Sequence, residues 1–302
     1  MRFIRPEYIF RPSQIVRRLA YTIRNKHQPT QANTPWGTSI HFDPSELHGR
    51  AMLTLGLPDL RTCEMISRIV RKGDICIDIG ANIGIMTSLM ATRAGSSGTV
   101  YAFEPHPKTR LVLELNASSW KNKATMAEIN VLPYAVSNRN GKAILFEPSN
   151  FSQNWGIATL EFEHKKSGDK QEGIEVDCIT FDSFFNDASD IKLVKIDVEG
   201  HEDFVLTGMK EKLTKSLIKY ILFEEHRTLP SPACDYLEKF GYKSYLIDRS
   251  LLAPKLIDVK MCPKKIYKET TNILAVLRKD SDIDIANLTQ PGWSCLSVSG
   301  AI

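Results

Sequence analysis

Short runs of β-branched and apolar residues alternate with segments of helical periodicity from Asp74 onward, and this alternation constrains the fold more than any other feature of the chain. Strands are predicted at 75–80, 99–105, 129–137, 192–198, 220–225, 243–248 and 272–278, and helices near 84–94, 107–120, 201–213 and 232–241. Apolar strands separated by helices are typical of a parallel sheet covered on both faces. We therefore expect an α/β fold with a mostly parallel seven-stranded sheet, whose last two strands form an antiparallel closing pair.

One interval, at about 138–190, interrupts the alternation and predicts a β insertion over the sheet. It opens with "SNRNGKAILF", in which Asn140-Gly141 is typical of a hairpin turn. "GIATLEFE" and "IEVDCITFDSFF" follow as strands, separated by the polar loop 164–173. Between them, "EPSNFSQNWG" carries Phe151 and Trp155, so this segment either closes an acceptor pocket as a lid or uses its aromatic side chains to anchor a long loop.

The N-terminal extension, residues 1–58, is predicted to contain an amphipathic helix within 13–25. Arginines lie on one side of this helix, and the opposite face is formed by Ile15, Val16, Leu19, Ala20 and Ile23. We expect this apolar face to pack on the protein body; the alternative, a basic helix resting on an anionic membrane, is not favoured. The main domain is expected at 59–280, beginning with a helix within 59–74, and a C-terminal tail at 281–302.

The composition is that of an ordinary soluble globular protein, with 42% hydrophobic and 25% charged residues. The net charge of +4 is too small to indicate a nucleic-acid partner. No run of about 18 apolar residues predicts a transmembrane helix, and the basic N-terminus lacks the apolar segment of a secretory signal. The six cysteines show no zinc-type spacing, so we expect free thiols in a reducing cytoplasm.

The stretch "CIDIGANIG", residues 76–84, predicts a cofactor site, because it is a strand that ends in a glycine-rich turn and opens a helix. Gly80 and Gly84 flank Asn82, which does not fit the G-x-G-x-x-G spacing of a dinucleotide loop. Asp78 would repel a pyrophosphate but suits the ammonium and sulfonium groups of S-adenosylmethionine. Glu104, at the end of the next strand, is placed to accept hydrogen bonds from ribose hydroxyls. These residues favour S-adenosylmethionine over NAD.

Six motifs occur in the order found in FkbM-type methyltransferases, which the chain resembles over residues 70 to 278: "DIGANIG", "FEP", "YAVSNRNGKA", "ITFDSF", "KIDVEGHEDFVLTGM" and "ILFEEH". The resemblance implies a Rossmann-like fold and S-adenosylmethionine-dependent methyl transfer, usually to a hydroxyl oxygen. Known acceptors in the family include polyketide hydroxyls and sugars. The positions that match cofactor-binding residues are Asp78, Gly80, Ala81, Asn82, Gly84 and Glu104, with Ala135 and Ser137 where the adenine edge is read.

The fourth predicted strand, "LVKIDVEGHE", should lie next to the first and end beside the transferable methyl group. Strand alternation places Lys195, Asp197 and Glu199 on one side. A buried Lys195 needs a carboxylate partner, for which Glu224 is our candidate, either in the chemistry or in a structural ion pair.

Asp197 has the strongest claim to catalysis in this segment. His201 is a further candidate general base. Asp197, Glu224 and Glu225 would suit a hard divalent ion, but no spacing requires one and we predict no metal.

The predicted function is O-methylation of a hydroxyl on a carbohydrate or another small molecule. A nucleic-acid methyltransferase is disfavoured, because neither an N/D-P-P-Y/F motif nor a Pro-Cys nucleophile follows the fourth strand. Two alternatives remain: an NAD-linked oxidoreductase, and a non-catalytic S-adenosylmethionine-binding module held at a membrane by residues 1–26.

Overall fold

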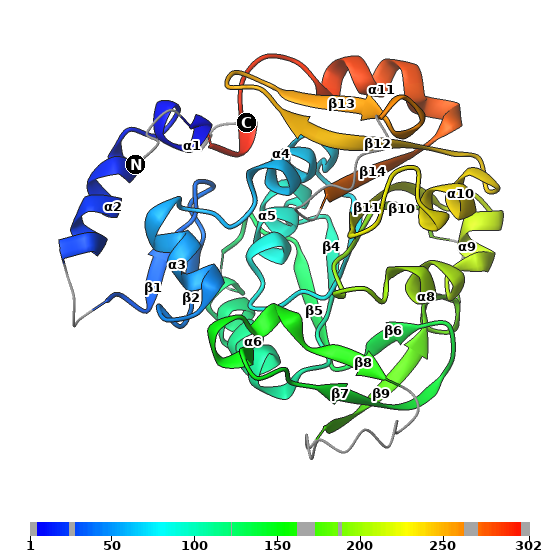
Figure 1. Ribbon diagram of the computed structural model, residues 1–302, viewed down its shortest axis with the longest axis horizontal. Coiled ribbons are helices and arrows are strands. Elements are labelled where there is room, and N and C mark those ends of the chain that lie inside the picture. Colours follow the sequence, from blue (N-terminus) through cyan, green and yellow to red (C-terminus); the bar gives the residue numbers. More distant parts are fainter. Residues whose placement is uncertain are drawn as a thin grey trace.

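The computed structural model describes residues 5–23, 28–121, 123–161, 173–186, 189–262 and 271–296, and is built around one mixed sheet of eight strands (Figure 1). In spatial order these are β13 (Pro254–Asp258), β12 (Tyr242–Arg249), β14 (Thr271–Leu277), β11 (Ile218–Glu225), β10 (Ile191–Ile196), β3 (Ile75–Ile79), β4 (Thr99–Phe103) and β5 (Glu128–Leu132). The α/β prediction is confirmed.

The five strands from β11 to β5 are parallel, so their carboxyl ends meet at one edge of the sheet. β10 lies beside β3 as predicted, with Lys195 opposite Asp78. β14 runs antiparallel between β11 and β12, which confirms the antiparallel closing strand. β13 is an eighth strand that the sequence did not predict. It is short, begins with Pro254 and carries Lys255, features that natural sheets use at their edges.

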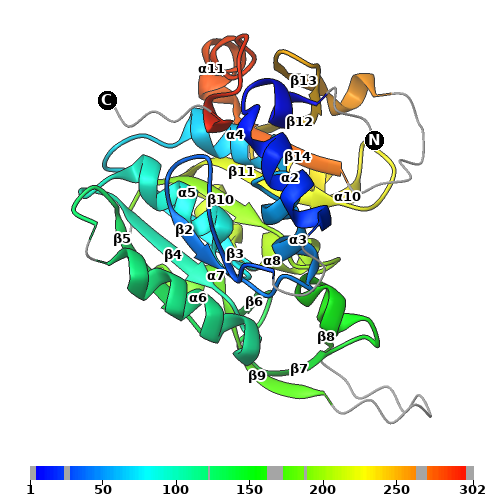
Figure 2. The ribbon, with the colours of Figure 1, turned by 90° about the vertical axis from the view of Figure 1, so that its left-hand side faces the viewer.

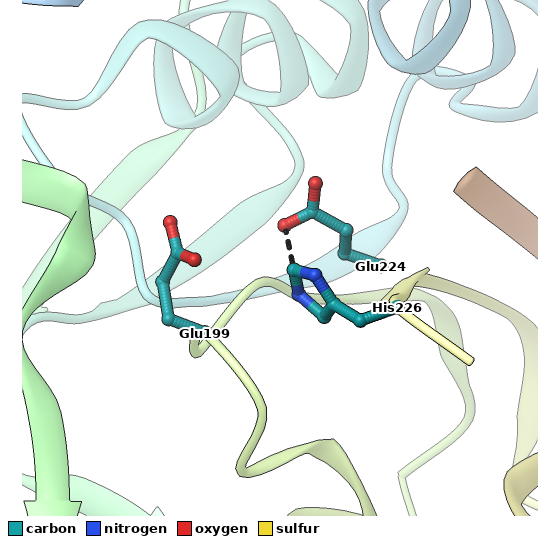
Figure 3. A group of neighbouring side chains, drawn as sticks. All are labelled: Glu199, Glu224 and His226. Carbon is teal, nitrogen blue, oxygen red and sulfur yellow. Dashed lines mark ion pairs between the residues drawn. The ribbon is translucent and has the colours of Figure 1, made fainter. Parts of the chain in front are cut away.

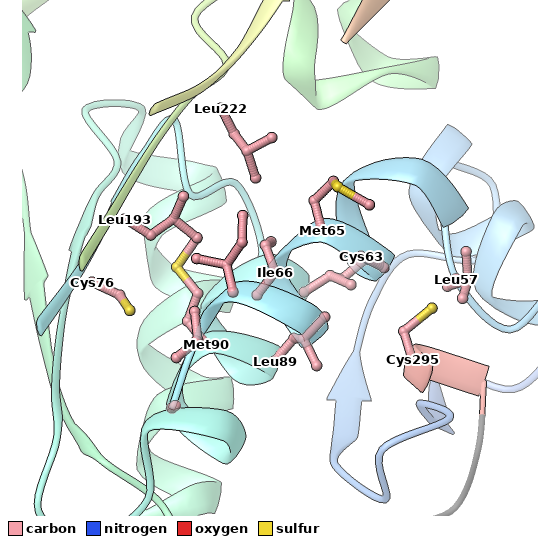
Figure 4. Packing of buried hydrophobic residues seen from close by; sticks show 14 of the residues in the cluster. Leu57, Cys63, Met65, Ile66, Cys76, Leu89, Met90, Leu193, Leu222 and Cys295 are labelled. Atoms are coloured by element: carbon pink, nitrogen blue, oxygen red, sulfur yellow. The ribbon is translucent and has the colours of Figure 1, made fainter. Parts of the chain in front are cut away.

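Helices cover both faces of the sheet, and alternate residues of each strand supply two separate cores. On one face, Cys76, Leu193 and Leu222 pack against α4 and α5 (Figure 4). On the other face, Val194 and Phe223 pack among the helices that follow β9, β10 and β11. The helices of the main domain are α4 (Leu60–Ile69), α5 (Ile85–Ala94), α6 (Pro107–Trp120), α7 (Phe181–Phe184), α8 (Glu202–Thr207), α9 (Lys210–Thr214), α10 (Pro232–Glu238) and α11 (Ser281–Leu288).

The insertion forms a separate four-stranded sheet of order β6-β9-β7-β8. Its strands are β6 (Ala135–Ser137), β7 (Gly141–Phe146), β8 (Thr159–Glu161) and β9 (Ile174–Thr180). The predicted strand 129–137 is therefore two strands, β5 and β6, in different sheets. Much of the predicted polar loop 164–173 lies outside the described residues.

The hairpin predicted at Asn140-Gly141 is wrong, because β9 lies between β6 and β7. The side-chain oxygen of Asn140 instead accepts hydrogen bonds from Thr180 N at 2.7 Å and Ser183 Oγ at 2.9 Å.

The helix predicted at 201–213 is interrupted between α8 and α9. A Cβ added to Gly208, where α8 ends, would lie 2.0 Å from the carbonyl oxygen of Ser137. The close passage of β6 therefore requires glycine at this position.

The N-terminal extension lies along the outside of the main domain, with α2 against α3 (Figures 1 and 2). It contains α1 (Pro6–Ile9), α2 (Ser13–Ile23), β1 (Gln31–Asn33), β2 (Ser39–His41) and α3 (Leu47–Thr54). The prediction that α2 packs through its apolar face is wrong, since Val16, Leu19 and Ile23 are 68%, 44% and 79% exposed. The face turned inward carries the buried Gln14, whose amide donates to Leu53 O at 3.1 Å. No helix in the described ranges is both long and apolar enough to cross a membrane.

The C-terminal segment is bound to α4 by a buried charge. The carboxylate of Glu64 is fully buried and accepts hydrogen bonds from the backbone N–H groups of Ser294 and Cys295, both at 2.8 Å. Arg68 pairs with Glu64 and donates to Gly292 O at 2.8 Å. Residues 292–295 are therefore an integral part of the packing around α4.

We expect Glu64→Ala to lower the free energy of unfolding by roughly 3–5 kcal/mol, because it leaves Arg68 and two backbone donors without their buried acceptor. Glu114→Ala is the matched control: that carboxylate is largely exposed and pairs with Arg110 one helical turn away. Its loss should cost less than about 0.5 kcal/mol. Chemical denaturation measures both, and equal effects would show that the C-terminal segment contributes nothing to stability.

Candidate active site

A pocket opens at the carboxyl ends of β3, β4 and β10, where ligands of open α/β sheets bind. Its empty space is about 1010 Å³, including the part open to solvent. We call it the first pocket. Its lining includes Gly80, Ala81, Asn82, Glu104, His106, Ala135, Trp155, Lys195, Asp197, Glu199 and His201.

The β3–α5 loop forms the floor of this pocket and is fixed by backbone contacts. Gly80 N and Ala81 N both donate to Phe103 O at 3.0 Å. Gly80 has φ +74°, and a Cβ there would lie 1.9 Å from the carbonyl oxygen of Asp197, so no side chain fits. Asn82 also lies in the left-handed region, with φ 51°. Gly84 does not line the pocket; a Cβ there would lie 2.5 Å from Leu113 of α6, so this glycine permits helix packing instead.

Glu104 is held at the edge of the pocket by two backbone donors. Its carboxylate accepts from Asn82 N at 2.8 Å and from His106 N at 3.0 Å. Burial raises the pKa of Glu104 to about 7. A buried carboxylate that is pre-oriented in this way is well placed to accept hydrogen bonds from the hydroxyl groups of a bound ligand.

An ion-pair network joins the carboxyl ends of β3 and β10 beside the pocket; Lys195 and Asp78 are buried in it, whereas the Asp197 side chain is 44% exposed. Lys195 Nζ lies 3.2 Å from Asp78 Oδ1 and 3.3 Å from Asp197 Oδ2, and donates to Gly80 O at 2.8 Å. The expectation that Glu224 pairs with Lys195 is therefore wrong. Burial lowers the pKa of Lys195, but the two aspartates outweigh it and raise the pKa above its usual value. Lys195 thus remains charged.

Asp78 does not line the first pocket. Its carboxylate is fully buried and also accepts from Thr87 Oγ1 at 2.6 Å. Its position fits an indirect role, in which Asp78 and Lys195 hold the carbonyl of Gly80 and so set the shape of the loop.

A second pocket adjoins the first on the side of α3 and β11. His48, Lys195, Asp197 and Glu199 line both, so they mark the junction. The second pocket is also lined by the polar side chains of Arg61, Asn154, Glu224 and Asn272. A ligand in one pocket can therefore meet a ligand in the other beside Asp197.

The two acids at the junction differ in charge state. Burial raises the pKa of Asp197, but Lys195 outweighs it and lowers the pKa below its usual value, so Asp197 is ionised at neutral pH. For Glu199, burial and the negative charges of Asp197 and Glu224 raise the pKa to about 7. Glu199 also has φ 51°, a conformation that non-glycine residues rarely adopt.

His201, a predicted candidate base, is held by contacts within the protein. It lines the first pocket, but its Nε2 lies 2.9 Å from Ser137 Oγ and its ring stacks on Phe204 at a centroid distance of 4.6 Å. Burial lowers the pKa of His201 to about 4, so the ring is neutral at pH 7. Ser137 is fully buried and lies behind Ala135, which does line the pocket.

The insertion covers the first pocket through the segment around two short 3-10 turns, Phe151–Gln153 and Trp155–Ile157. Phe151 is buried and stacks on His106 at 4.6 Å, so it anchors the segment. Trp155 lines the pocket, with Lys108 Nζ 4.3 Å from its ring centroid. Within the described residues, His106 Nδ1 and Trp155 Nε1 are buried without a hydrogen-bond partner, as expected for atoms that meet a polar ligand.

One group in the described part of the chain has the donor set for a divalent ion. Glu199, Glu224 and His226 each offer one ligand atom within 4.8 Å of the others (Figure 3). In the structure His226 Nε2 lies 3.7 Å from Glu224 Oε2, so these two already form an ion pair when the histidine is protonated. Glu225, which the sequence suggested for such a site, is instead bound by Arg227 at 2.8 Å.

His48 is the site residue that the sequence did not predict. It comes from α3, in the extension that precedes the recognisable motifs, and its Nδ1 lies 3.0 Å from Glu46 Oε1. The only local signal is a glutamate two residues before a histidine in "SELHG", which is too common to indicate a site.

The strand order and the glycine loop define a Rossmann-like α/β protein with a pocket at the carboxyl ends of its central strands. The model of the methyltransferase FkbM domain matches residues 78–244, and the chain belongs to this family.

Two relatives are 30% and 24% identical to the chain over the residues that align. The hexuronic acid methyltransferase AglP of Haloferax volcanii is 30% identical over 174 residues, 56% of this chain and 64% of the relative. The 2-O-methyltransferase NoeI of Sinorhizobium fredii is 24% identical over 173 residues, 54% of this chain and 68% of the relative. The chain thus spans about two thirds of the length of the relatives that it matches.

Among solved structures, the methyltransferase FkbM of Methylobacillus flagellatus aligns with 78% of this chain and 56% of its own, at 14% identity and a TM-score of 0.41.

Glu199→Gln should stabilise the protein at high pH. Because the folded pKa is raised to about 7, the folded state binds more protons than the unfolded state between about pH 4 and 7, and stability falls as pH rises through that window. Glutamine removes the charged form. We expect its melting temperature to exceed that of the wild type by roughly 2–4 °C at pH 8, and the difference to shrink as the pH falls and to vanish near pH 4. A difference independent of pH would contradict the raised pKa.

Proposed function

We propose that the chain is an S-adenosylmethionine-dependent O-methyltransferase whose acceptor is a hydroxyl group of a sugar, with a hexose or a hexuronic acid as the leading candidates. The observation that carries the proposal is the junction of two pockets beside Asp197. One pocket has the features of a nucleoside site and the other is lined by polar side chains. Family membership and the names of the two relatives support the same reaction.

In the first pocket, Glu104 would accept hydrogen bonds from the ribose hydroxyls, and Ala135 would lie near the adenine. The backbone of Gly80, Ala81 and Asn82 would contact the amino-acid end, with the loop shaped by Asp78 and Lys195. The cofactor supplies an activated methyl group, so the chain's contribution is to position the acceptor and to remove its proton.

In the second pocket, Asn154 and Asn272 offer hydrogen bonds to sugar hydroxyls, and Arg61 offers a positive charge to the carboxylate of a uronic acid. Asp197, ionised at neutral pH, would accept a hydrogen bond from the reacting hydroxyl and orient it. A small natural product with a hydroxyl group is the second candidate acceptor. Six buried free cysteines support a reducing compartment such as the cytoplasm.

The cofactor assignment predicts micromolar binding of S-adenosylmethionine and no binding of NAD in calorimetry. Glu104→Ala should weaken S-adenosylmethionine by roughly 10- to 100-fold, because it removes a charged acceptor worth about 1.5–3 kcal/mol. Glu128→Ala, an exposed carboxylate at the start of β5, should leave the affinity unchanged. Binding of NAD in preference to S-adenosylmethionine would refute the assignment.

The acceptor assignment predicts transfer of a labelled methyl group to phenyl glucoside or phenyl glucuronide. Asp197→Asn should keep the affinity for S-adenosylmethionine within about threefold while lowering the transfer rate by roughly 10²-fold, since an amide cannot orient the hydroxyl as an anion does. If Asp197→Asn loses cofactor binding to the same extent as Glu104→Ala, Asp197 belongs to the cofactor site.

A further inference from the structure

We propose that His48, held by Glu46, is the general base that takes the proton of the acceptor hydroxyl. This inference rests on the proposed function but concerns residues outside the matched FkbM domain, which begins at residue 78. Both residues lie at the start of α3, where Glu46 caps the helix.

The first argument is the geometry of a fixed imidazole. The carboxylate of Glu46 is buried and accepts from His48 N at 2.8 Å, Gly49 N at 3.2 Å, Trp155 N at 3.3 Å and the ring Nδ1 of His48 at 3.0 Å. Burial raises the pKa of Glu46, but the hydrogen bonds from His48 and the backbone outweigh it and lower the pKa. Glu46 is therefore an anion that accepts a proton-bearing Nδ1.

The second argument is the position of the other ring nitrogen of His48, Nε2. With Nδ1 protonated, Nε2 of neutral His48 carries a lone pair. Across the described ranges, no hydrogen-bond partner is found for Nε2. His48 lines both pockets and so faces the junction where cofactor and acceptor would meet.

The third argument is electrostatic. Lys195 is the main cause that lowers the pKa of Asp197, and a positive charge on His48 adds to it; for Glu199 the same charge offsets part of the rise in pKa that burial and the neighbouring acids cause, so both acids lie close enough to stabilise it. A proton moved to His48 therefore enters a site with Glu46 on one side and two acids on the other. A proton moved to Glu199 would meet no such gain, because no hydrogen-bond partner that would orient this acid is found among the residues that the structure describes.

The step balances without any further reactant. As the acceptor oxygen attacks the methyl carbon, the carbon–sulfur bond breaks and its electron pair stays on sulfur. The hydroxyl proton passes to Nε2 of His48, which later releases it to solvent. Glu46 keeps its charge and holds the imidazolium by its Nδ1–H.

The test combines a spectroscopic and a kinetic readout. In protein labelled with ¹⁵N-histidine and free of cofactor, we expect the Nδ1–H tautomer at His48 and its loss in Glu46→Gln. The Nε2–H tautomer in the wild type would overturn the proposal, whether or not an acceptor is known.

With phenyl glucuronide or phenyl glucoside as acceptor, His48→Ala should lose roughly 10²-fold in kcat, keep its affinity for S-adenosylmethionine and recover activity in free imidazole. His41→Gln is the control, since His41 contacts Asn116 outside both pockets. Unchanged transfer in His48→Ala, or loss without imidazole rescue, would overturn the base assignment. A wild type that binds no S-adenosylmethionine would refute the proposed function instead.

A separate observation carries a second inference: we propose that the exposed apolar face of α2 binds an anionic lipid surface. Val16, Leu19, Ala20 and Ile23 recur at helical spacing on one exposed face, while the helix is attached through the polar Gln14. Amphipathic helices of this kind lie in membrane interfaces.

Charge complementarity identifies the partner. The first 26 residues hold seven Lys and Arg and one acidic residue, Glu7, whereas the rest of the chain has a slight negative balance. The net positive charge of the chain thus comes from the segment that contains the exposed apolar face of α2. An anionic lipid surface matches both features, since it attracts the basic residues and accepts the apolar ones.

The experiment is co-sedimentation of the full chain with vesicles of pure phosphatidylcholine or with 30% phosphatidylglycerol. We expect binding to the anionic vesicles alone, weakened by at least tenfold in Val16→Gln/Ile23→Gln and unchanged in Leu111→Gln, an equally exposed apolar residue of α6. Equal sedimentation with both vesicles, or with the double variant, would overturn the proposal. A dimer that the double variant dissociates, without vesicle binding, would assign the face to a second copy of the chain.

Discussion

The contact between Lys195 and its two aspartates is the interaction on which the site depends. A lysine at the end of a central strand is costly to bury unless carboxylates compensate its charge. Asp78 does so from β3, and Asp197 does so from the residue that follows β10; the pairing of Lys195 with Asp78 also supports the register of the two strands at their carboxyl ends. Because the same ammonium donates to Gly80 O, the shape of the glycine loop follows from the charge network.

The strained backbone of the molecule is concentrated at this junction. Asn82 and Glu199 both adopt left-handed conformations, which cost about 1–3 kcal/mol for non-glycine residues. Gly80 is needed because β10 passes within 1.9 Å of where its Cβ would stand. These backbone conformations bring the loops after β3 and β10 together. The loop after β3 lines the first pocket, and the loop after β10 lines both pockets. These conformations make the strand ends less stable than they would be in an idealised sheet. Such a loss of stability is typical of residues placed for binding or chemistry.

The features that were predicted correctly are those that local sequence patterns determine. Strand and helix periodicity placed the parallel sheet, and the glycine loop and Glu104 fell at its carboxyl edge. Non-local contacts were not predictable in the same way. Asn140-Gly141 has the composition of a hairpin, but β9 enters between the strands it joins, and nothing near Asn140 encodes that. The partner of Lys195 depended on register, since Asp78 and Glu224 are both carboxylates on neighbouring strands. Glu46 and His48 escaped notice because their importance arises only when α3 is folded over the strand ends.

The position of each acid at the junction decides whether it would assist the departure of sulfur or the removal of the proton from the acceptor hydroxyl. In methyl transfer the positive charge on sulfur disappears, so a carboxylate beside the sulfonium would stabilise the ground state more than the transition state. A carboxylate beside the group that gains the proton does the opposite, because positive charge develops there. Asp197 and Glu199 border both pockets and lie close enough to His48 for a positive charge on its ring to interact with them. Under the proposed function, their negative charge would be more useful on the acceptor side, where it would favour proton removal, than beside the sulfonium of the cofactor.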